Sequence, residues 1–312
     1  MKLGIVLDPL EDVKTYKDST YAIMREAAAR GHSLFVMQQQ DLFLRDAQVF
    51  GFARSLTLLD SAEIWYSVQE PRETPLSDLD VILMRKDPPF DMEYIYSTYL
   101  LELAEAQGAR IFNRPRAIRD YNEKLSTAKF PELGPPTLVT RQAERLHEFL
   151  REHRDVIFKP LDGMGGTSVF RVTQNDVNLN VIIETLTELG RKTIMAQRYI
   201  PEIGQGDKRI LLIDGKAAPF CLARIPKAGE TRGNLATGGT GVAQPLSPRD
   251  WHIAETLGPK LRNDGLLLVG LDVIGDYLTE INVTSPTCMQ EIQQQTGFNV
   301  AALLIDALEA LL

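Results

Sequence analysis

The amino-acid sequence predicts an α/β protein, in which an N-terminal domain with a parallel sheet is followed by two α+β units. Within residues 1–120, short apolar strands alternate with helical segments, an order typical of a mostly parallel sheet with helices on its faces. Two later stretches, 156–173 and 270–288, each read as a strand, a turn or glycine loop, and a second strand. The length of 312 residues allows two or three domains and a large core.

The first unit comprises residues 1–121. Its expected elements are a strand at 2–7, a helix from Asp18 or Ser19 to about 30, hairpin-like pieces at 47–53 and 63–68, a strand at 79–84, a helix at 91–107 and strands at 33–37 and 109–112. Arg85 and Lys86 follow the strand at 79–84, at the end where parallel sheets bind ligands. This basic pair either holds an anionic substrate or is two solvated charges.

The second and third units comprise residues 122–200 and 201–312. Their expected elements are helical stretches at 122–130, 141–153, 176–189 and 299–312, a helix from Ser247 or Asp250 to about 262, and strands at 138–139, 193–200, 210–213, 217–225 and 266–271. A linker rich in proline and glycine at 131–136 lies between the helical stretch at 122–130 and the strand at 138–139.

A glycine-rich loop at residues 162–168 joins two strands within 156–173. Three glycines, Gly163, Gly165 and Gly166, allow backbone N–H groups to turn inward and surround a phosphate. The spacing is neither a Rossmann fingerprint nor a Walker A loop, and most glycine loops simply connect strands. Lys159 lies on the preceding apolar strand, where a buried ammonium needs an anionic partner, and a phosphate fits that need.

The segment 226–241 is rich in glycine, polar and free of aromatic residues. It cannot bury much apolar surface, so we expect it to be mobile. It is either a flexible linker or a lid that closes over a reacting centre and excludes water. Arg232 and Asn234 within it, and Arg224 before it, favour the lid.

Residues 270–288 carry three oxygen-bearing side chains, Asp272, Glu280 and Asn282, which suit a hard divalent cation. Glu280 and Asn282 share one face of a strand. A two-residue loop at Gly275 and Asp276 would place Asp272 opposite Thr279. We therefore predict a three-residue or bulged turn, which brings Asp272 opposite Glu280. The alternative is a half-buried hairpin whose polar face is merely solvated.

The bulk composition limits the classes of function. A net charge of −8 argues against a nucleic-acid-binding surface, although a local basic pocket for a small anion stays compatible with it. No apolar run reaches the ~18 residues of a membrane span. The N-terminus reads as a first strand rather than a signal peptide. Cys221 and Cys288 are expected to be free thiols in a reducing cytoplasm.

Together, two lysines for phosphate (Lys124 and Lys159), a glycine loop, a Gly/Arg segment and a late Asp…Glu-x-Asn cluster meet the needs of ATP and Mg²⁺ chemistry without a P-loop. The sequence resembles the bacterial glutathione synthetase family of the ATP-grasp superfamily. The resemblance covers the whole chain, and its motifs are LMRKDPPFD (83–91), NEKL (122–125), KPLDGMGG (159–166), CLARIP (221–226), ETRGNLA (230–236) and GLDVIG…LTEINVTSPTC (270–288).

The resemblance implies the ATP-grasp fold, with two α+β domains sandwiching ATP beside the N-terminal domain. It implies a cytoplasmic ligase that joins γ-glutamylcysteine to glycine through an acyl phosphate, with Mg²⁺ or Mn²⁺ as the metal. It also implies a homo-oligomer, a homotetramer in that family. The composition already gives neither nucleic acid nor a membrane as an expected partner. The alternatives are another ATP-grasp carboxylate–amine ligase, acting for instance on D-alanine, or an ATP-binding regulator without turnover.

The resemblance also implies roles for individual residues, beginning with Asp272, Glu280 and Asn282 as metal ligands. The implied ATP-binding residues are Lys124, Lys159, Gly163, Met164, Gly165, Gly166, Gln197, Arg198, Tyr199, Ile200 and Asp207, with the backbone of 197–200 reading the adenine and Asp207 the ribose. The implied substrate-binding residues are Arg85, Arg224, Asn234, Ser285, Pro286 and Thr287. The implied catalytic residues are Arg209, Lys159, Arg224 and Arg232.

Overall fold

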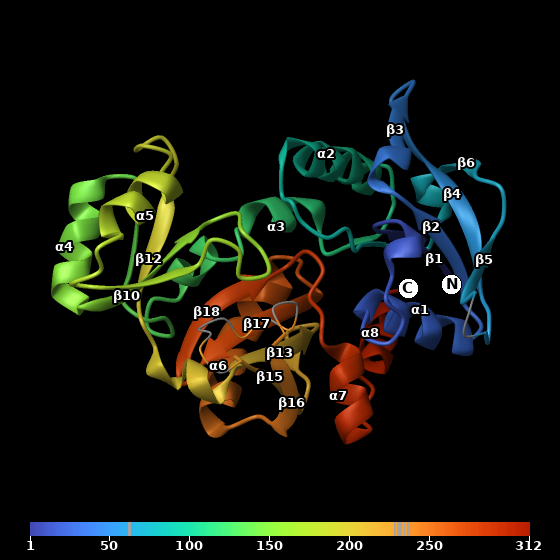
Figure 1. Cartoon of the computed structure of the whole chain (residues 1–312). Helices are drawn as coiled ribbons and strands as arrows, with labels where there is room; N and C mark the ends of the chain where they lie inside the picture. Colours follow the sequence, from blue (N-terminus) through green and yellow to red (C-terminus); the bar gives the residue numbers. More distant parts are fainter. Residues whose placement is uncertain (62–63, 228, 230–232, 234, 236–237) are drawn as a thin grey trace.

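The structure, a computed structural model, describes residues 1–61, 64–227, 229, 233, 235 and 238–312. Within these residues the strands form three sheets, of eight, four and six strands. In Figure 1 the eight-stranded sheet lies on the right, the four-stranded sheet on the left, and the six-stranded sheet below and between them. No helix in the described part of the chain is long and apolar enough to cross a membrane.

The N-terminal sheet has the strand order β3-β4-β2-β1-β7-β8, with β5 and β6 paired to β4. Its elements are β1 (Lys2–Val6), α1 (Ser19–Ala29), β2 (Ser33–Met37), β3 (Leu42–Arg45), β4 (Gln48–Leu58), β5 (Tyr66–Val68), β6 (Arg72–Pro75), β7 (Val81–Met84), α2 (Met92–Ala106), β8 (Ile111–Phe112) and α3 (Pro115–Asp120). As predicted, Asp18 and Asp91 cap α1 and α2 by accepting backbone N–H bonds. The predicted parallel order holds for β2-β1-β7-β8. The strands β3 to β6 are antiparallel, and β4 and β5 fall on the hairpin-like pieces that the sequence predicted at 47–53 and 63–68.

The four-stranded sheet, in the order β11-β10-β12-β9, is antiparallel. Its elements are β9 (Thr137–Thr140), α4 (Ala143–His153), β10 (Asp155–Pro160), β11 (Phe170–Thr173), α5 (Leu179–Leu186) and β12 (Ile194–Arg198). Alternate residues of β10 point to opposite faces. Val156 and Phe158 pack under α4 and α5, while Ile157 and Lys159 face the other way. Helices therefore cover one face, and Lys159 lies on the face that is left open.

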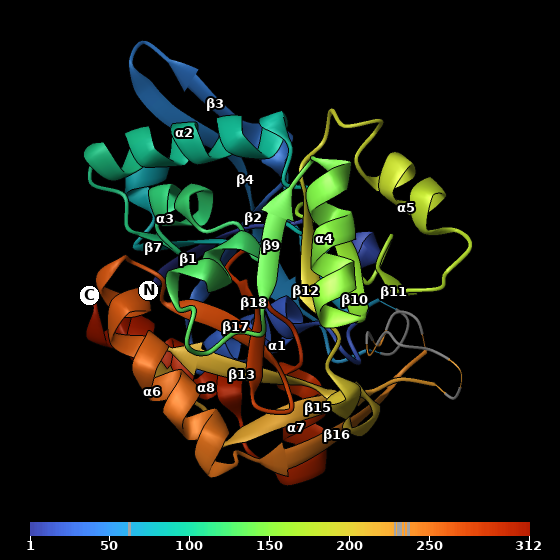
Figure 2. The same cartoon turned by 90° about the vertical axis from the view of Figure 1, so that its left-hand side faces the viewer.

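The six-stranded sheet has the order β16-β15-β13-β17-β18, with β14 paired to β13. Its elements are β13 (Asp207–Ile213), β14 (Lys216–Ala217), β15 (Phe220–Ile225), β16 (Thr240–Pro245), α6 (Pro248–Asn263), β17 (Leu268–Ile274) and β18 (Tyr277–Asn282). Leu271 and Val273 pack against α6, so Asp272 between them points away from this helix. Figure 2 shows α6 along the outer side of this sheet.

The chain closes with α7 (Met289–Thr296) and α8 (Val300–Ala310). Both helices share one hydrophobic core with α1, β1 and one face of β13. This core joins the N-terminal sheet to the six-stranded sheet, and it brings the loops before α1 close to the start of α7. The division into units at 121 and 200 stays a prediction. The sequence did not predict α7 or α3, and the helix expected at 122–130 is a short 3-10 helix, Leu125–Lys129.

Candidate active site

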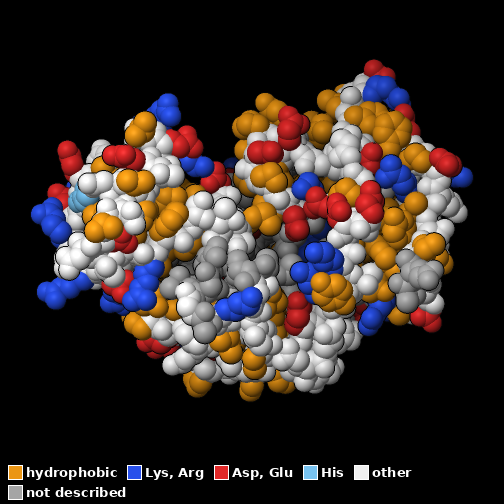
Figure 3. Space-filling view, viewed as in Figure 1, with side chains coloured by type: hydrophobic (Ala, Val, Ile, Leu, Met, Phe, Trp, Pro, Cys, Tyr) orange, Lys and Arg blue, Asp and Glu red, His pale blue; other side chains and the backbone are white. Residues whose placement is uncertain are grey.

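A cavity of about 480 Å³ lies where the four-stranded and six-stranded sheets meet loops next to the N-terminal sheet, and Figure 3 shows a hollow bordered by charged side chains in the middle of the face seen in Figure 1. The four-stranded sheet contributes β12 and the glycine loop, and the six-stranded sheet contributes β13, β15, β17 and β18. The loops before α1 and after β7 close the remaining side. The cavity is therefore built from segments that are far apart in the sequence.

The hairpin of β17 and β18 settles the position of Asp272. Ile274 pairs with Tyr277 across a two-residue loop, but a bulge after Asp272 shifts the register, so that Asp272 pairs with Glu280. The bulged turn is confirmed and the three-residue turn is wrong. The extra residue, Thr279, donates its hydroxyl to the Asp272 carbonyl at 3.1 Å. Asp272, Glu280 and Asn282 consequently share one face, which lines the cavity.

Two arginines surround the Asp272 carboxylate. Arg209 donates two hydrogen bonds to it, at 2.5 and 3.0 Å, and an Arg224 Nη2–Asp272 Oδ2 ion pair measures 2.9 Å. Burial by itself would raise the pKa of Asp272, but the two guanidinium groups outweigh it and hold that pKa well below its usual range. Asp272 therefore stays ionised and fixes both arginines at the cavity wall.

Asp207 begins β13 and forms the second contact of Arg224, at 2.5 Å. Its other carboxylate oxygen is buried and has no hydrogen-bond partner among the described residues. Burial raises the pKa of Asp207 to about 7, because Asp272 and Glu280 reinforce the effect and Arg224 opposes it only in part. An unpaired buried acceptor is costly unless a ligand donates to it, so this oxygen suits a ligand hydroxyl such as that of a ribose.

The raised pKa of Asp207 makes stability depend on pH. The folded-state pKa of about 7 exceeds the ordinary value of 3.8, so this group's contribution to stability is full below pH 3.8 and is lost as the pH rises through 7. We expect the free energy of unfolding of the wild type to fall relative to that of Asp207→Asn between pH 5 and 8. Urea denaturation at both pH values measures this, and parallel pH profiles of the two proteins would contradict it.

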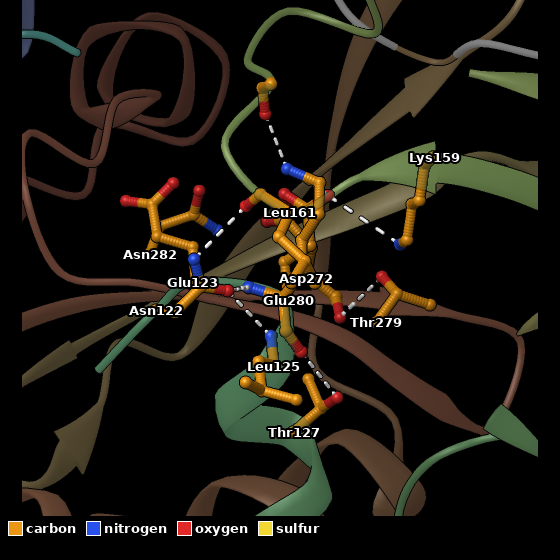
Figure 4. Close-up of polar contacts among 12 residues, drawn as sticks. Asn122, Glu123, Leu125, Thr127, Lys159, Leu161, Asp272, Thr279, Glu280 and Asn282 are labelled. Carbon is orange, nitrogen blue, oxygen red and sulfur yellow. Dashed lines mark hydrogen bonds and ion pairs between the residues drawn. The ribbon is translucent and has the colours of Figure 1, made fainter. Parts of the chain in front are cut away.

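Lys124 and Lys159 both approach Glu280, and Figure 4 shows Lys159 and Glu280. The ammonium groups lie 3.6 and 3.8 Å from a Glu280 oxygen, and Lys124 also donates to the Gly163 carbonyl at 2.5 Å. Burial lowers the pKa of Lys159, and Glu280 opposes this shift. Each lysine keeps N–H donors for another anion. Two ammonium groups beside one glycine loop are suited to phosphate oxygens.

The glycine loop lines the cavity beside this cluster, through residues 163–167. Gly165 and Gly166 have φ values of +64° and +77°, which other residues rarely adopt. The strand–loop–strand pattern that the sequence predicted is thus confirmed by β10 and β11.

The end of β12 lines the same cavity through residues 197–200. The Gln197 amide bonds to Thr137, the Arg198 guanidinium to Tyr277, and the Tyr199 ring lies under Arg171. These side chains are held by the protein itself, so a ligand at this strand would meet mainly backbone. The backbone N–H groups of Arg198 and Tyr199 also have partners within the protein, Pro136 and Asp155.

The loop after β18 brings Ser285, Pro286 and Thr287 to the cavity. Arg85 does not line this cavity: it is 4% exposed and lies behind the loop, donating to the Pro286 carbonyl at 3.1 Å and to Thr20. The structure therefore places Arg85 as a support of the loop. Arg232 and Asn234 lie outside the described residues.

Several lining residues were not singled out from the sequence. Glu123 could have been, since it adjoins Lys124; it accepts from Thr284 at 2.9 Å, and burial raises its pKa. Asp87 lies within the motif LMRKDPPFD, and the other charged lining residues carry no pattern that marks a site: Asp12, Lys14, Lys17, Asp18 and Glu291.

Gly270 on β17 is also part of the site, because an added Cβ would lie 2.8 Å from Arg209 Cδ and 2.9 Å from Pro286 Cβ. We expect Gly270→Ala to displace Arg209 or the loop at 286 and to lower kcat/KM at least about tenfold, since small misplacements of catalytic groups are costly. Steady-state kinetics measure this, with the exposed Gly204, which has open space around it, as the matched glycine-to-alanine control. Equal activities of the two variants would contradict the packing argument.

The residues present fit a divalent cation. The Asn282 amide nitrogen donates to the Gly270 carbonyl at 3.2 Å, which leaves the amide oxygen as a ligand. Glu280 has a partly exposed carboxylate, and each carboxylate oxygen of Asp272 can accept more than one contact. Oxygen donors of this kind are what Mg²⁺ and Mn²⁺ prefer.

Comparison with protein-family models matches the whole architecture. Residues 1–119 match the prokaryotic glutathione synthetase N-terminal domain, and residues 123–297 match the prokaryotic glutathione synthetase ATP-grasp domain.

Relatives of similar length agree with these matches. The chain is 64% identical to the glutathione synthetase of Nitrosomonas europaea, covering 99% of this chain and 98% of the relative. It is 53% identical to the glutathione synthetase of Escherichia coli, again covering 99% and 98%.

Solved structures show the same fold at low sequence identity. D-cycloserine synthetase DcsG matches with a TM-score of 0.71 at 13% identity, covering 100% of both chains. The RimK domain protein ATP-grasp from Sphaerobacter thermophilus matches with a TM-score of 0.66 at 17% identity, covering 98% of this chain and 99% of the other. The chain has the ATP-grasp fold and belongs to the prokaryotic glutathione synthetase family of ATP-dependent ligases.

Proposed function

We propose that this chain is a glutathione synthetase, which joins γ-L-glutamyl-L-cysteine to glycine while ATP is converted to ADP and phosphate. One observation carries the proposal. A single cavity is lined by Lys124, Lys159 and the glycine loop, which suit phosphate oxygens. The same cavity is lined by Glu280 and Asn282 and by the loop at 285–287. ATP, a cation and a carboxylate substrate would therefore meet in it.

The lysines and the loop would hold the nucleotide. Lys124, Lys159 and the N–H groups of residues 163–166 contact the phosphates, the end of β12 faces the adenine, and the unpaired oxygen of Asp207 accepts from the ribose. A cation at Asp272, Glu280 and Asn282 would neutralise charge on the phosphate oxygens.

The arginines would serve the transfer itself. Arg209 and Arg224 each use Nε and Nη2 on the carboxylates and carbonyl that anchor them, and among the described residues no contact engages their Nη1, which can donate into the cavity. The cysteinyl carboxylate oxygen attacks the γ-phosphorus of ATP, and ADP leaves. The fixed guanidinium groups stabilise the charge that develops on the phosphoryl oxygens.

The second step forms the peptide bond. The neutral amine of glycine attacks the acyl carbon, the C–O bond to phosphate breaks with its electron pair, and the amine loses a proton. The Ser285–Thr287 loop would position the peptide substrate, with Arg85 supporting it from behind. Arg232 and Asn234, outside the described residues, stay candidates for the same step.

We further propose Mg²⁺ as the metal, with Mn²⁺ as a substitute, because the donors are all oxygens. Both cysteines are buried free thiols, as predicted, which supports a reducing cytoplasmic location. A homotetramer is proposed on the family resemblance alone, and sedimentation would test it.

The experiment is ADP release with γ-glutamylcysteine, glycine and Mg²⁺ each omitted in turn. We expect release to require all three and to match glutathione formed. Release that continues without the dipeptide or glycine would contradict the proposal. Preference for another acid or amine, such as D-alanine, would indicate a different ATP-grasp ligase, and ATP binding without turnover would indicate a regulator.

A further inference from the structure

The chain leaves the six-stranded sheet directly after the strand that carries Glu280 and Asn282. The pairing of β17 with β18 ends at Gly270 and Asn282, and the loop at 284–287 then turns toward the cavity. A backbone that leaves a ladder inside a protein loses its hydrogen-bond partners, and buried N–H and C=O groups are rarely left without any. The backbone at this point therefore needs a partner other than a strand.

The Asn113 side chain is this partner. It is 5% exposed, and it directly follows β8 of the N-terminal sheet. Its amide nitrogen donates to the carbonyls of Leu268 and Val283, both at 2.8 Å. Its amide oxygen accepts from the N–H groups of Leu267 and Leu268, at 2.7 and 2.9 Å. An asparagine amide has two N–H donors and two acceptor lone pairs, so its full capacity is used here.

These four hydrogen bonds lie where β17 and β18 separate. Leu268 precedes Gly270 by two residues on β17, and Val283 directly follows Asn282. The Asn113 amide thus binds the backbone of both segments just beyond the last ladder pair, and it does so from a different sheet. The ladder ends at this amide, and the residues after Val283 continue toward the cavity instead of along β17.

The residues after Val283 are held by further side chains. The Thr284 hydroxyl donates to Glu123 at 2.9 Å. The Pro286 carbonyl accepts from Arg85 at 3.1 Å. Among the described contacts of these supporting side chains, only those of Asn113 join the loop segment to β17. The Asn113 amide therefore sets the direction in which the loop begins.

We propose that Asn113 is a positioning residue for the peptide substrate. It directs the loop at 285–287 into the cavity, where the proposed function has the peptide substrate bind. ATP is held in that proposal by the glycine loop and the end of β12, and none of the hydrogen bonds of Asn113 among the described residues reaches either. This inference rests on the proposed function and adds a residue that lies outside the cavity lining.

Asn113→Ala removes the amide from four buried backbone groups. We expect KM for γ-glutamylcysteine to rise at least about tenfold at saturating ATP and Mg²⁺, since leaving buried polar groups without partners carries a free-energy cost of this size. KM for ATP should not change. Steady-state kinetics measure both values. Asn180→Ala, at an exposed asparagine of α5, is the matched control and should change neither.

A purely structural role of Asn113 would lower stability without separating the two substrates. Leu261→Ala provides the comparison, because Leu261 is buried in α6, on the face of the same sheet that points away from the cavity. It should lower the urea midpoint and leave both KM values unchanged. Equal increases of both KM values in Asn113→Ala, or no change in either, would overturn the inference.

A measurement on the wild type does not depend on whether the variant folds. Coupling between two sites is reciprocal, so a dipeptide whose binding depends on the Asn113 hydrogen bonds stabilises these bonds in return. With Mg²⁺ and a non-hydrolysable ATP analogue present throughout, γ-glutamylcysteine should slow hydrogen exchange of the Leu267 and Leu268 amides. Unchanged exchange in an enzyme that makes glutathione would overturn this inference alone. A wild type that makes no glutathione would overturn the proposed function and this inference with it.

Discussion

Asp272→Asn is expected to lower the free energy of unfolding by about 3–5 kcal/mol, the usual cost of breaking a buried ion pair from one side. Asp272 is 3% exposed, and it is the shared partner of Arg209 and Arg224. Its removal leaves Arg224 paired with Asp207, and it leaves the buried Arg209 without a carboxylate partner among the described residues. Because the same contacts aim both arginines into the cavity, turnover should be lost as well. Urea denaturation and an ADP-release assay measure the two effects.

Asp306→Asn provides the matched control. Asp306 also pairs with an arginine, Arg30, but its side chain is 60% exposed. A solvent-exposed pair contributes about 0–1 kcal/mol, so this variant should stay close to the wild type. Similar unfolding free energies for the two variants would show that the Asp272 cluster is not held as described.

Glu280→Gln is expected to lower kcat about 10²–10³-fold while the fold stays intact, a loss typical of removing one group that stabilises developing charge. Glu280 is the acidic partner of Lys124 and Lys159 and a proposed metal ligand. Its neutralisation should also raise the Mg²⁺ concentration needed for half-maximal activity. The exposed Glu144→Gln on α4 is the control. An unchanged rate and an unchanged Mg²⁺ requirement would remove Glu280 from the metal site.

The sequence was most informative where local pattern and chemistry coincide. The strand–loop–strand at Lys159 and the Asp272, Glu280 and Asn282 triplet were predicted because strand periodicity decides which side chains share a face. The hairpin shows the limit of this reasoning. At the bulge, the Thr279 hydroxyl donates a hydrogen bond to the Asp272 carbonyl. The spacing of residues in the sequence does not predict this tertiary contact.

Residues whose role depends on tertiary packing could not be predicted. Arg85 follows a parallel strand, as a ligand-binding residue would. The loop at Pro286 packs over it, however, so that Arg85 is buried and supports this loop through a hydrogen bond to the Pro286 carbonyl. Lys17 and Glu291 line one cavity only because α7 packs with α1, as in the hydrogen bond between Met289 and Ser19, which are 270 positions apart. The pairing of the strands between 42 and 75 could not be predicted for a related reason, since β4 pairs antiparallel with β3, β5 and β6 as well as with β2.

The central claim is that ATP activates the cysteinyl carboxylate by phosphorylation. The most direct measurement uses γ-glutamylcysteine labelled with ¹⁸O in that carboxylate, followed by mass spectrometry of the phosphate released as glutathione forms. If an acyl phosphate forms and glycine displaces phosphate, one carboxylate oxygen remains with phosphorus, and each phosphate should carry one ¹⁸O. Phosphate without the label, at the same yield of glutathione, would contradict the account.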